Sequence, residues 1–142
     1  MTAKEYLSQL KDYEDTIRTG RDTVARMEAE LYSLSGIDYS QDKVQTSPDA
    51  DAGMIAKLDA LTKEKDRIDR LTIEKMELRI VILGQLEGME TYAYRSLLYR
   101  RYVEYKRLDV IAEEMSYEYG YIRQLHGAAL QEFERLYLSD SD

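Results

Sequence analysis

In the first third of the chain, apolar residues recur at alternating steps of four and three residues, with one glycine among them. The positions are Tyr6, Leu10, Tyr13, Ile17, Gly20, Val24, Met27, Leu31 and Leu34. Steps of four and three place side chains along one side of an α-helix, as in a coiled-coil seam. Thr2 and Glu5 match a capping box and Gly36 is a typical stop signal, so we expect a helix from about Ala3 to Leu34. Such a seam requires a partner helix.

A second long helix is expected after a connection over about residues 36–53, which concentrates Ser, Asp and Gly with the single proline. Ser47 and Pro48 suit the N-cap and first turn of this helix. Its later stretch, LTIEKMELRIVILGQLEG, is apolar around much of its circumference, which predicts a change of neighbours along the helix. The two helices form either an antiparallel hairpin within one chain, which we prefer, or a dimeric coiled coil.

The residue inventory argues against catalysis. The chain has no cysteine and one histidine, His126, which lies in the helical stretch QLHGAALQEF without a neighbouring serine. Neither the GxxxxGK[ST] nor the GxGxxG phosphate-binding pattern occurs, and no carboxylate spacing suggests a metal site. We therefore expect no enzyme, no cofactor and no metal. We also expect a cytoplasmic protein, because there is no signal-peptide pattern and no apolar run of the roughly 18 residues that span a membrane.

The last third of the chain has the outline of a helix-turn-helix. Three helical segments follow in close order: TYAYRSLLYRRYVEY, LDVIAEEM and EYGYIRQLHGAALQEFERLY. Apolar or small residues stand where a miniature core must close between the last two segments: Ile111, Ala112, Met115, Ile122 and Leu125. Ser116 occupies the turn position at which glycine is commonest.

The string from Ile122 to Phe133, IRQLHGAALQEF, resembles the recognition helix of the fourth conserved region of sigma-70 type initiation factors. Leu97, Leu98, Arg101, Tyr102 and the IAEEM segment fit the preceding part of that region. The whole chain also resembles a family of small phage and prophage proteins of Gram-positive bacteria, whose members begin MTAKEYL, carry a VQTSP-like segment and end with LHGxAL.

These resemblances imply an all-α fold with two parts. A long, coiled-coil-like helical hairpin would occupy residues 1–88, and a three-helix, sigma-like helix-turn-helix with an acidic tail would occupy residues 89–142. They also imply a DNA-binding role.

The resemblance assigns the reading of DNA bases to the first turns of the last helix. Arg123 and Gln124 stand at the second pair of reading positions, whereas Tyr119 and Gly120 replace the basic and acidic residues of the first pair. Arginine can bind guanine and glutamine can bind adenine in the major groove. Tyr119 and Tyr121, with Tyr117, suit phosphate and thymine contacts or a protein interface, and both interpretations stay open.

The charge of this part of the chain opposes DNA binding. Residues 90–142 contain seven Lys and Arg against ten Asp and Glu, a net charge of 7 − 10 = −3. DNA-binding domains are usually basic. We therefore expect the basic side chains, Arg95 and Arg123 included, to gather on one side while the acidic tail, Glu113 and Glu114 face away. Four of the basic residues are expected to contact phosphates: Arg100, Arg101, Lys106 and Arg107.

Two functional hypotheses follow. In the first, the chain is a phage or prophage transcription regulator that binds double-stranded DNA and uses its N-terminal helices to form a homodimer or to contact RNA polymerase. In the second, the chain is a protein-interaction module whose tyrosine-rich, acidic surface binds RNA polymerase, a sigma factor or another phage protein.

Overall fold

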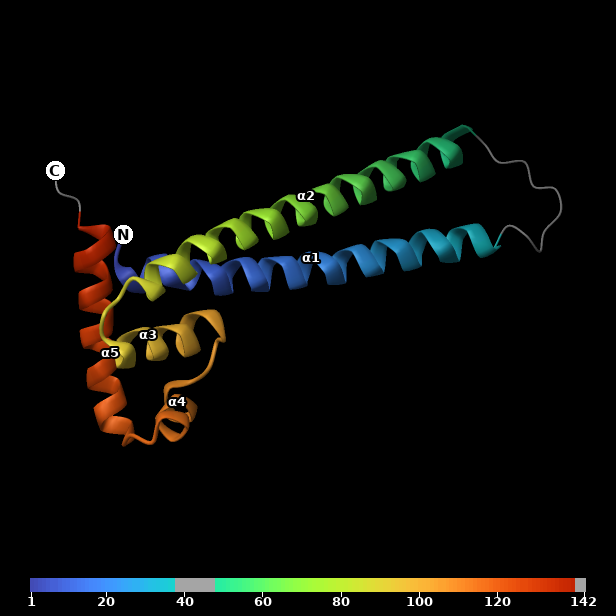
Figure 1. The fold of residues 1–142 in the computed structure, drawn as a ribbon. Helices are drawn as coiled ribbons and strands as arrows, with labels where there is room; N and C mark the ends of the chain where they lie inside the picture. Colours follow the sequence, from blue (N-terminus) through green and yellow to red (C-terminus); the bar gives the residue numbers. More distant parts are fainter. Residues whose placement is uncertain (38–47, 140–142) are drawn as a thin grey trace. The chain divides into compact units, whose positions relative to one another are not determined.

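The computed structural model describes residues 1–37 and 48–139, and the only regular secondary structure in this part of the chain is helix, without a β-strand (Figure 1). The helices are α1 (Ala3–Ile37), α2 (Pro48–Glu87), α3 (Tyr92–Leu98), α4 (Leu108–Met115) and α5 (Tyr119–Phe133). A π-helical turn follows α3 (η2, Tyr99–Val103) and another follows α5 (η3, Glu134–Leu138). The predicted all-α class is confirmed.

The ends of the two long helices lie close to the expected positions. The backbone N–H of Thr2 donates to Oε1 of Glu5 at 2.8 Å and that of Glu5 donates to Oγ1 of Thr2 at 3.1 Å, which is the predicted capping box. α1 continues past Gly36 and α2 begins at Pro48, so helix extends into both ends of the connection expected over 36–53. A glycine costs a helix only about 1 kcal/mol relative to alanine, which α1 can tolerate near its end. Residues 38–47, including Ser47, lie outside the described residues.

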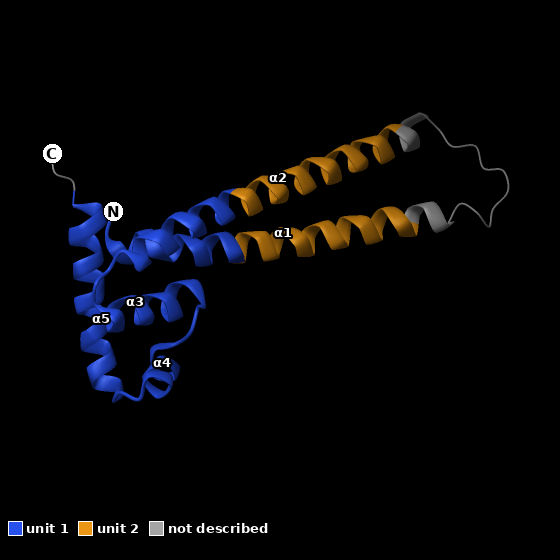
Figure 2. Ribbon diagram, viewed as in Figure 1, with its two compact units in different colours: residues 1–14, 74–142 blue, residues 15–73 orange. Residues whose placement is uncertain are grey.

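The chain divides into two compact units, one formed by residues 1–14 and 74–142 and the other by residues 15–73 (Figure 2). This division differs from the boundary expected near residue 88. The first turns of α1 and the last turns of α2 belong with the C-terminal helices. The change of unit along α2 falls at Glu74, within the stretch for which the sequence predicts new neighbours.

In the unit of residues 15–73, α1 and α2 pack against each other within the chain. The seam residues Ile17 and Gly20 are buried, as is Ile68 of α2. A β-carbon on Gly20 would lie 2.9 Å from Cγ1 of Ile68, so glycine permits this close approach. The Nζ atom of Lys65 lies 2.9 Å from Oε2 of Glu28. The seam at Gly20 therefore faces Ile68 of α2 in this unit.

In the unit of residues 1–14 and 74–142, the first turns of α1 share a core with the C-terminal helices. Phe133 of α5 is fully buried and its ring centre lies 5.8 Å from that of Tyr6. The Tyr6 hydroxyl donates to Oε1 of Gln85 at 2.9 Å, and the Nζ atom of Lys75 lies 2.6 Å from Oε2 of Glu14. The core also contains Ala3, Leu7, Leu10, Ile82, Leu86, Leu97 and Leu98. This core fixes α5 and the helices around it.

Candidate nucleic-acid interface

A tight turn joins α4 to α5. Ser116 follows the last residue of α4 and adopts the left-handed conformation, with φ 61° and ψ 41°. The backbone N–H of Tyr117 donates to the carbonyl of Ala112 at 2.9 Å and closes the end of α4. Glycine adopts this left-handed conformation most easily, so Ser116 accepts a steric cost that a glycine would avoid.

Small and apolar side chains hold α4 and α5 together as the sequence predicts. Ile111 and Ile122 are fully buried, Ala112 and Leu125 are nearly so, and Met115 is half-buried. The opposite side of α5 is therefore free of the core.

The predicted reading residues lie on that outer side of α5. Tyr119, Tyr121, Arg123 and Gln124 are all exposed. The guanidinium carbon of Arg123 lies 5.9 Å from the centre of the Tyr119 ring, a cation–π distance that helps to orient the arginine. Nothing lies within 4 Å of a β-carbon built on Gly120 or on Gly127. A ligand can therefore approach the backbone of this helix closely.

Two of the exposed tyrosines form a pair of their own. The ring centres of Tyr117 and Tyr121 lie 4.9 Å apart in an edge-to-face arrangement. Their exposed fractions are 40% and 49%. Such a pair has apolar faces and polar hydroxyls, so it suits contact with a nucleic acid or with a protein equally well.

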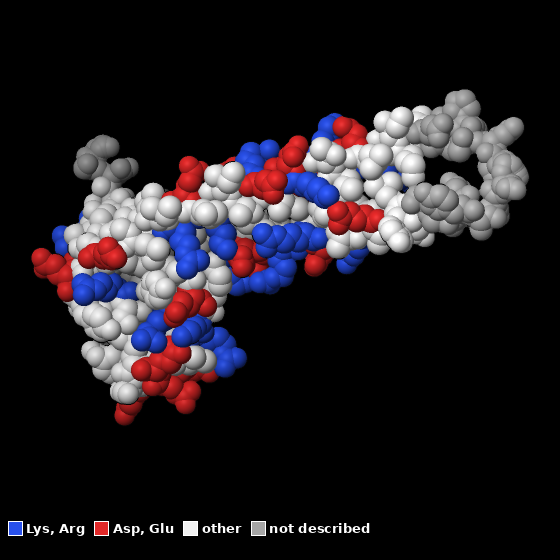
Figure 3. Space-filling model, turned by 45° about the vertical axis from the view of Figure 1, so that its right-hand side comes forward, with Lys and Arg blue, Asp and Glu red and all other residues white. Residues whose placement is uncertain are grey.

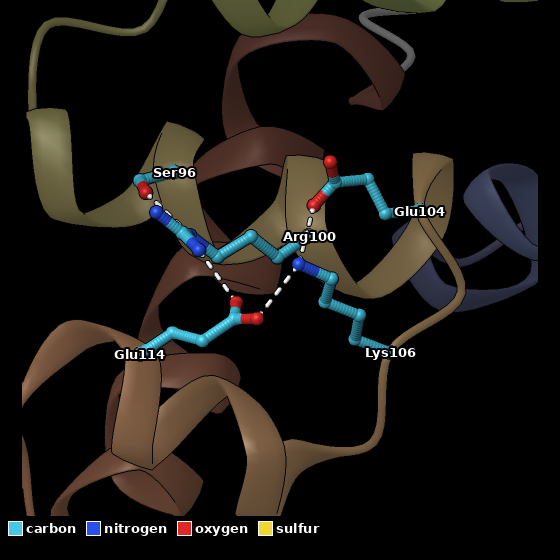
Figure 4. A network of polar contacts seen from close by, with 5 residues as sticks. All are labelled: Ser96, Arg100, Glu104, Lys106 and Glu114. Atoms are coloured by element: carbon cyan, nitrogen blue, oxygen red, sulfur yellow. Dashed lines mark hydrogen bonds and ion pairs between the residues drawn. The ribbon is translucent and has the colours of Figure 1, made fainter.

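Arg100 and Lys106, two of the four predicted phosphate contacts, share the carboxylate of Glu114 (Figure 4). Arg100 forms a hydrogen-bonded ion pair with Oε1 of Glu114, and the Nζ atom of Lys106 lies 2.7 Å from Oε2. Lys106 also lies 3.3 Å from Oε1 of Glu104. Hydrogen bonds from Lys106 and Arg100 lower the pKa of Glu114. The expectation that Glu114 faces away from the basic residues is therefore wrong, and the protein itself largely neutralises the two cations.

The other two predicted phosphate contacts differ from each other. Arg107 is exposed and its guanidinium binds the Asp109 carboxylate, with Nε 3.1 Å from Oδ1. Arg101 is half-buried, its Nη1 donates to the carbonyl of Lys106 at 3.0 Å, and it forms no ion pair among the described residues. Figure 3 shows basic and acidic side chains intermixed on the visible face. The four residues thus do not act as one free basic set.

His126 is half-buried and packs against Tyr102 of η2, which its position in a helical stretch of the sequence only partly indicates. Its Nε2 lies 2.8 Å from the hydroxyl oxygen of Tyr102. Burial, followed by the charges of Arg101 and Lys4, lowers the pKa of His126 to about 4. The imidazole is therefore neutral at physiological pH and serves packing between η2 and α5.

A cavity of about 380 Å³ lies between the end of α2 and α3. Its lining includes Leu83, Tyr92, Arg95 and Tyr99. The Met76, Ile80 and Val81 side chains on α2 are more than half exposed. These three exposed side chains belong to the stretch of α2 that is apolar around much of its circumference.

Within residues 1–37 and 48–139, no cluster of three or more metal-binding side chains is present. None of the described helices is long and apolar enough to cross a membrane. Comparisons of the chain with protein-family models, curated proteins and solved structures gave no match.

Proposed function

We propose that the chain is a DNA-binding transcription regulator of a phage or prophage, in which α4 and α5 form a sigma-like helix-turn-helix and α5 reads duplex DNA. One observation carries the proposal: Arg123 and Gln124 are adjacent and exposed on a helix whose opposite face is buried. A helix held in this way can enter the major groove without losing its own core.

The dimensions of α5 suit this role. Its 15 residues span about 22 Å at 1.5 Å per residue. In the major groove the Arg123 guanidinium would donate to the two acceptors of guanine, and the Gln124 amide would pair with adenine. Gly120 and Gly127, with open space beside them, would let the DNA come close to the helix. The buried Ile122 and Leu125 would keep both reading side chains aimed outward.

The exposed tyrosines would assist reading. Tyr119 would hold the Arg123 guanidinium near its ring, which reduces the entropy lost when arginine binds a base. Tyr117 and Tyr121 would bind phosphates through their hydroxyls or thymine methyl groups through their rings.

The two long helices would form the antiparallel hairpin, and they would join the helix-turn-helix to a partner, either RNA polymerase or a second copy of the chain. The intrachain contacts between Lys65 and Glu28 and between Ile68 and Gly20 favour a hairpin over a coiled coil made by two chains. A measured solution mass distinguishes monomer from dimer.

A second candidate function is a protein-interaction module that binds RNA polymerase, a sigma factor or another phage protein. It is favoured by the neutralised state of Arg100 and Lys106, because phosphate neutralisation supplies most non-specific DNA affinity. The exposed Tyr117–Tyr121 pair would then contact a protein.

A titration of labelled random-sequence duplex against the full chain separates the two candidates. The regulator should bind at about 50 mM salt and bind much more weakly at about 200 mM, because counterion release drives phosphate contacts. If the chain binds no duplex at the lower salt while RNA polymerase retains it, the protein-interaction candidate replaces the regulator.

A further inference from the structure

A basic hollow lies between α1 and η2, within the unit of residues 1–14 and 74–142. It has a volume of about 160 Å³. A single water needs only about 10–15 Å³ of such space, so the hollow has room for a group of several atoms. Its lining residues are Ser8, Lys11, Arg101, Tyr102 and Tyr105. None of these side chains is acidic.

The α1 side of the hollow follows from helical spacing. Lys4, Ser8 and Lys11 stand at steps of four and three, so they share one side of α1. Lys4 and Lys11 are exposed and Ser8 is half-buried. The Nζ atom of Lys11 lies 6.0 Å from the centre of the Tyr105 ring. Ser8 and Lys11 of α1 line the hollow, and Lys4 stands one turn earlier on the same side of the helix, outside the lining.

The η2 side of the hollow supplies Arg101. One guanidinium N–H is used by the carbonyl of Lys106, which fixes the side chain, and no carboxylate among the described residues pairs with it. Lys4 likewise forms no ion pair in the described part of the chain. This sets Arg101 apart from Arg100, Lys106 and Arg107, each of which binds a carboxylate.

Tyr105 lines one side of the hollow in an unusual backbone conformation. Tyr105 adopts the left-handed conformation with φ 60°, which is uncommon for a bulky residue. Its hydroxyl donates to the carbonyl of Leu10 at 3.3 Å, which ties this turn to α1. The ring is held beside Lys11 as a result.

The hollow lies next to the reading side of α5. Tyr102, one of its lining residues, contacts Nε2 of His126 at 2.8 Å. His126 is three residues after the exposed Arg123 and four after the buried Ile122, so it lies at the border between the reading side of α5 and its buried side. The charges of Lys4 and Arg101 both reach His126, where they add to the effect of burial on its pKa.

We infer that this hollow binds a backbone phosphate of the duplex that α5 reads, through Arg101, Lys4, Lys11 and the Ser8 hydroxyl. The inference rests on the proposed function and deepens it, because it moves the main phosphate contacts from Arg100, Lys106 and Arg107 to α1 and η2. The guanidinium and the ammonium groups bring positive charge and hydrogen-bond donors to a phosphate oxygen, and the Ser8 hydroxyl can donate to it as well.

The test measures binding of a random-sequence duplex to the full chain and to the variants Lys4→Glu and Arg101→Gln across a series of salt concentrations. An acidic residue in the first turn of α1 suits the helix dipole, so Lys4→Glu should fold normally. Each variant should bind about tenfold more weakly at about 0.1 M salt, and the slope of log K against log salt should fall by about 0.9 for each lost phosphate contact. The loss should be equal for all sequences, because phosphates carry no sequence information.

Arg107→Gln is the matched control, since it removes the same charge as Arg101→Gln from a residue that already binds Asp109. Its affinity should stay close to that of the parent. If both Lys4→Glu and Arg101→Gln bind every duplex as the parent does, the phosphate site is overturned, but the proposed regulator function is not. A parent that binds no duplex at low salt overturns the regulator and the inference together.

The hollow could hold inorganic phosphate from solution instead of a phosphate of the DNA backbone. Inorganic phosphate at millimolar concentration is therefore titrated against the parent and against Arg101→Gln. Stabilisation of the parent alone, combined with equal duplex affinity of the two proteins, would assign the hollow to a free phosphate and overturn the DNA contact.

Discussion

The hydroxyl oxygen of Tyr102 lies 2.8 Å from Nε2 of His126 and joins η2 to α5. Their rings are stacked, with centres 5.8 Å apart. The pKa of His126 falls from 6.5 to about 4, chiefly because of burial and then because of the charges of Arg101 and Lys4. The folded protein thus keeps this imidazole neutral, whereas the unfolded chain takes up its proton earlier as the pH falls.

This contact predicts acid sensitivity with a defined pH window. The stability contributed by neutral His126 is present above about pH 6.5 and is lost between 6.5 and about 4. At pH 5 the loss should be about 2 kcal/mol relative to pH 7.5, as linkage requires. Urea unfolding of the parent and of His126→Gln at both pH values checks this. Parallel pH dependence of the two proteins would contradict it.

Neutralisation of Arg100 and Lys106 by Glu114 predicts a gain of function. Glu114→Gln should release both cations and raise the affinity for random-sequence duplex several-fold, with a steeper salt dependence. Glu113→Gln is the control, since it changes the net charge equally at an exposed neighbour. Fluorescence anisotropy measures both. Equal effects of the two variants would show that only net charge matters.

The left-handed conformation of Ser116 predicts a stabilising substitution. Ser116→Gly should raise the free energy of unfolding by up to about 1 kcal/mol, because glycine adopts this conformation without the steric cost of a β-carbon. Ser96→Gly within α3 is the control: it should lower stability by about 0.5 kcal/mol through helix propensity, besides losing the hydroxyl that accepts from Nε of Arg100. Thermal melting of both variants provides the measurement, and a lower melting temperature for Ser116→Gly would argue against this turn.

The buried seam predicts a position-specific loss of stability. Ile17 is 2% exposed, so Ile17→Asp should cost several kcal/mol by burying a charge or by separating α1 from α2. Thr16→Asp, at the exposed neighbouring position, should change stability by less than about 0.5 kcal/mol. Circular dichroism and thermal melting compare the two. If Ile17→Asp keeps its full helicity and melting temperature, Ile17 does not pack between α1 and α2.

Local patterns predicted the helices because they depend on nearby residues. The heptad steps predicted the buried Ile17 and Gly20, and the turn pattern predicted the buried Ile111 and Ile122. The predicted seam covers only one stripe of α1, however. It missed Ala3 and Leu7, which are buried in a core shared with α5, because that second stripe depends on helices far along the chain.

The carboxylates with which the basic residues pair could not be predicted in the same way. The pairing of Arg100 with Glu114 joins residues on different elements, so no short spacing indicates it. The turn at Tyr105 lacks the glycine that usually marks a left-handed residue. The steps from Lys4 to Ser8 and Lys11 were visible in the sequence, but only the fold places Ser8 and Lys11 beside Arg101.

The most direct test of DNA reading by α5 is the affinity of the parent and Arg123→Ala for a duplex selected from a random pool, compared with single-base variants of that duplex. Arg123→Ala should fold normally, lose about 1–3 kcal/mol on the selected site and discriminate less at one base pair. Gln131→Ala, an exposed substitution further along α5, should bind as the parent does. If Arg123→Ala and Gln124→Ala bind every duplex with the parent's affinity, or if the selection yields no preferred site, α5 does not read DNA.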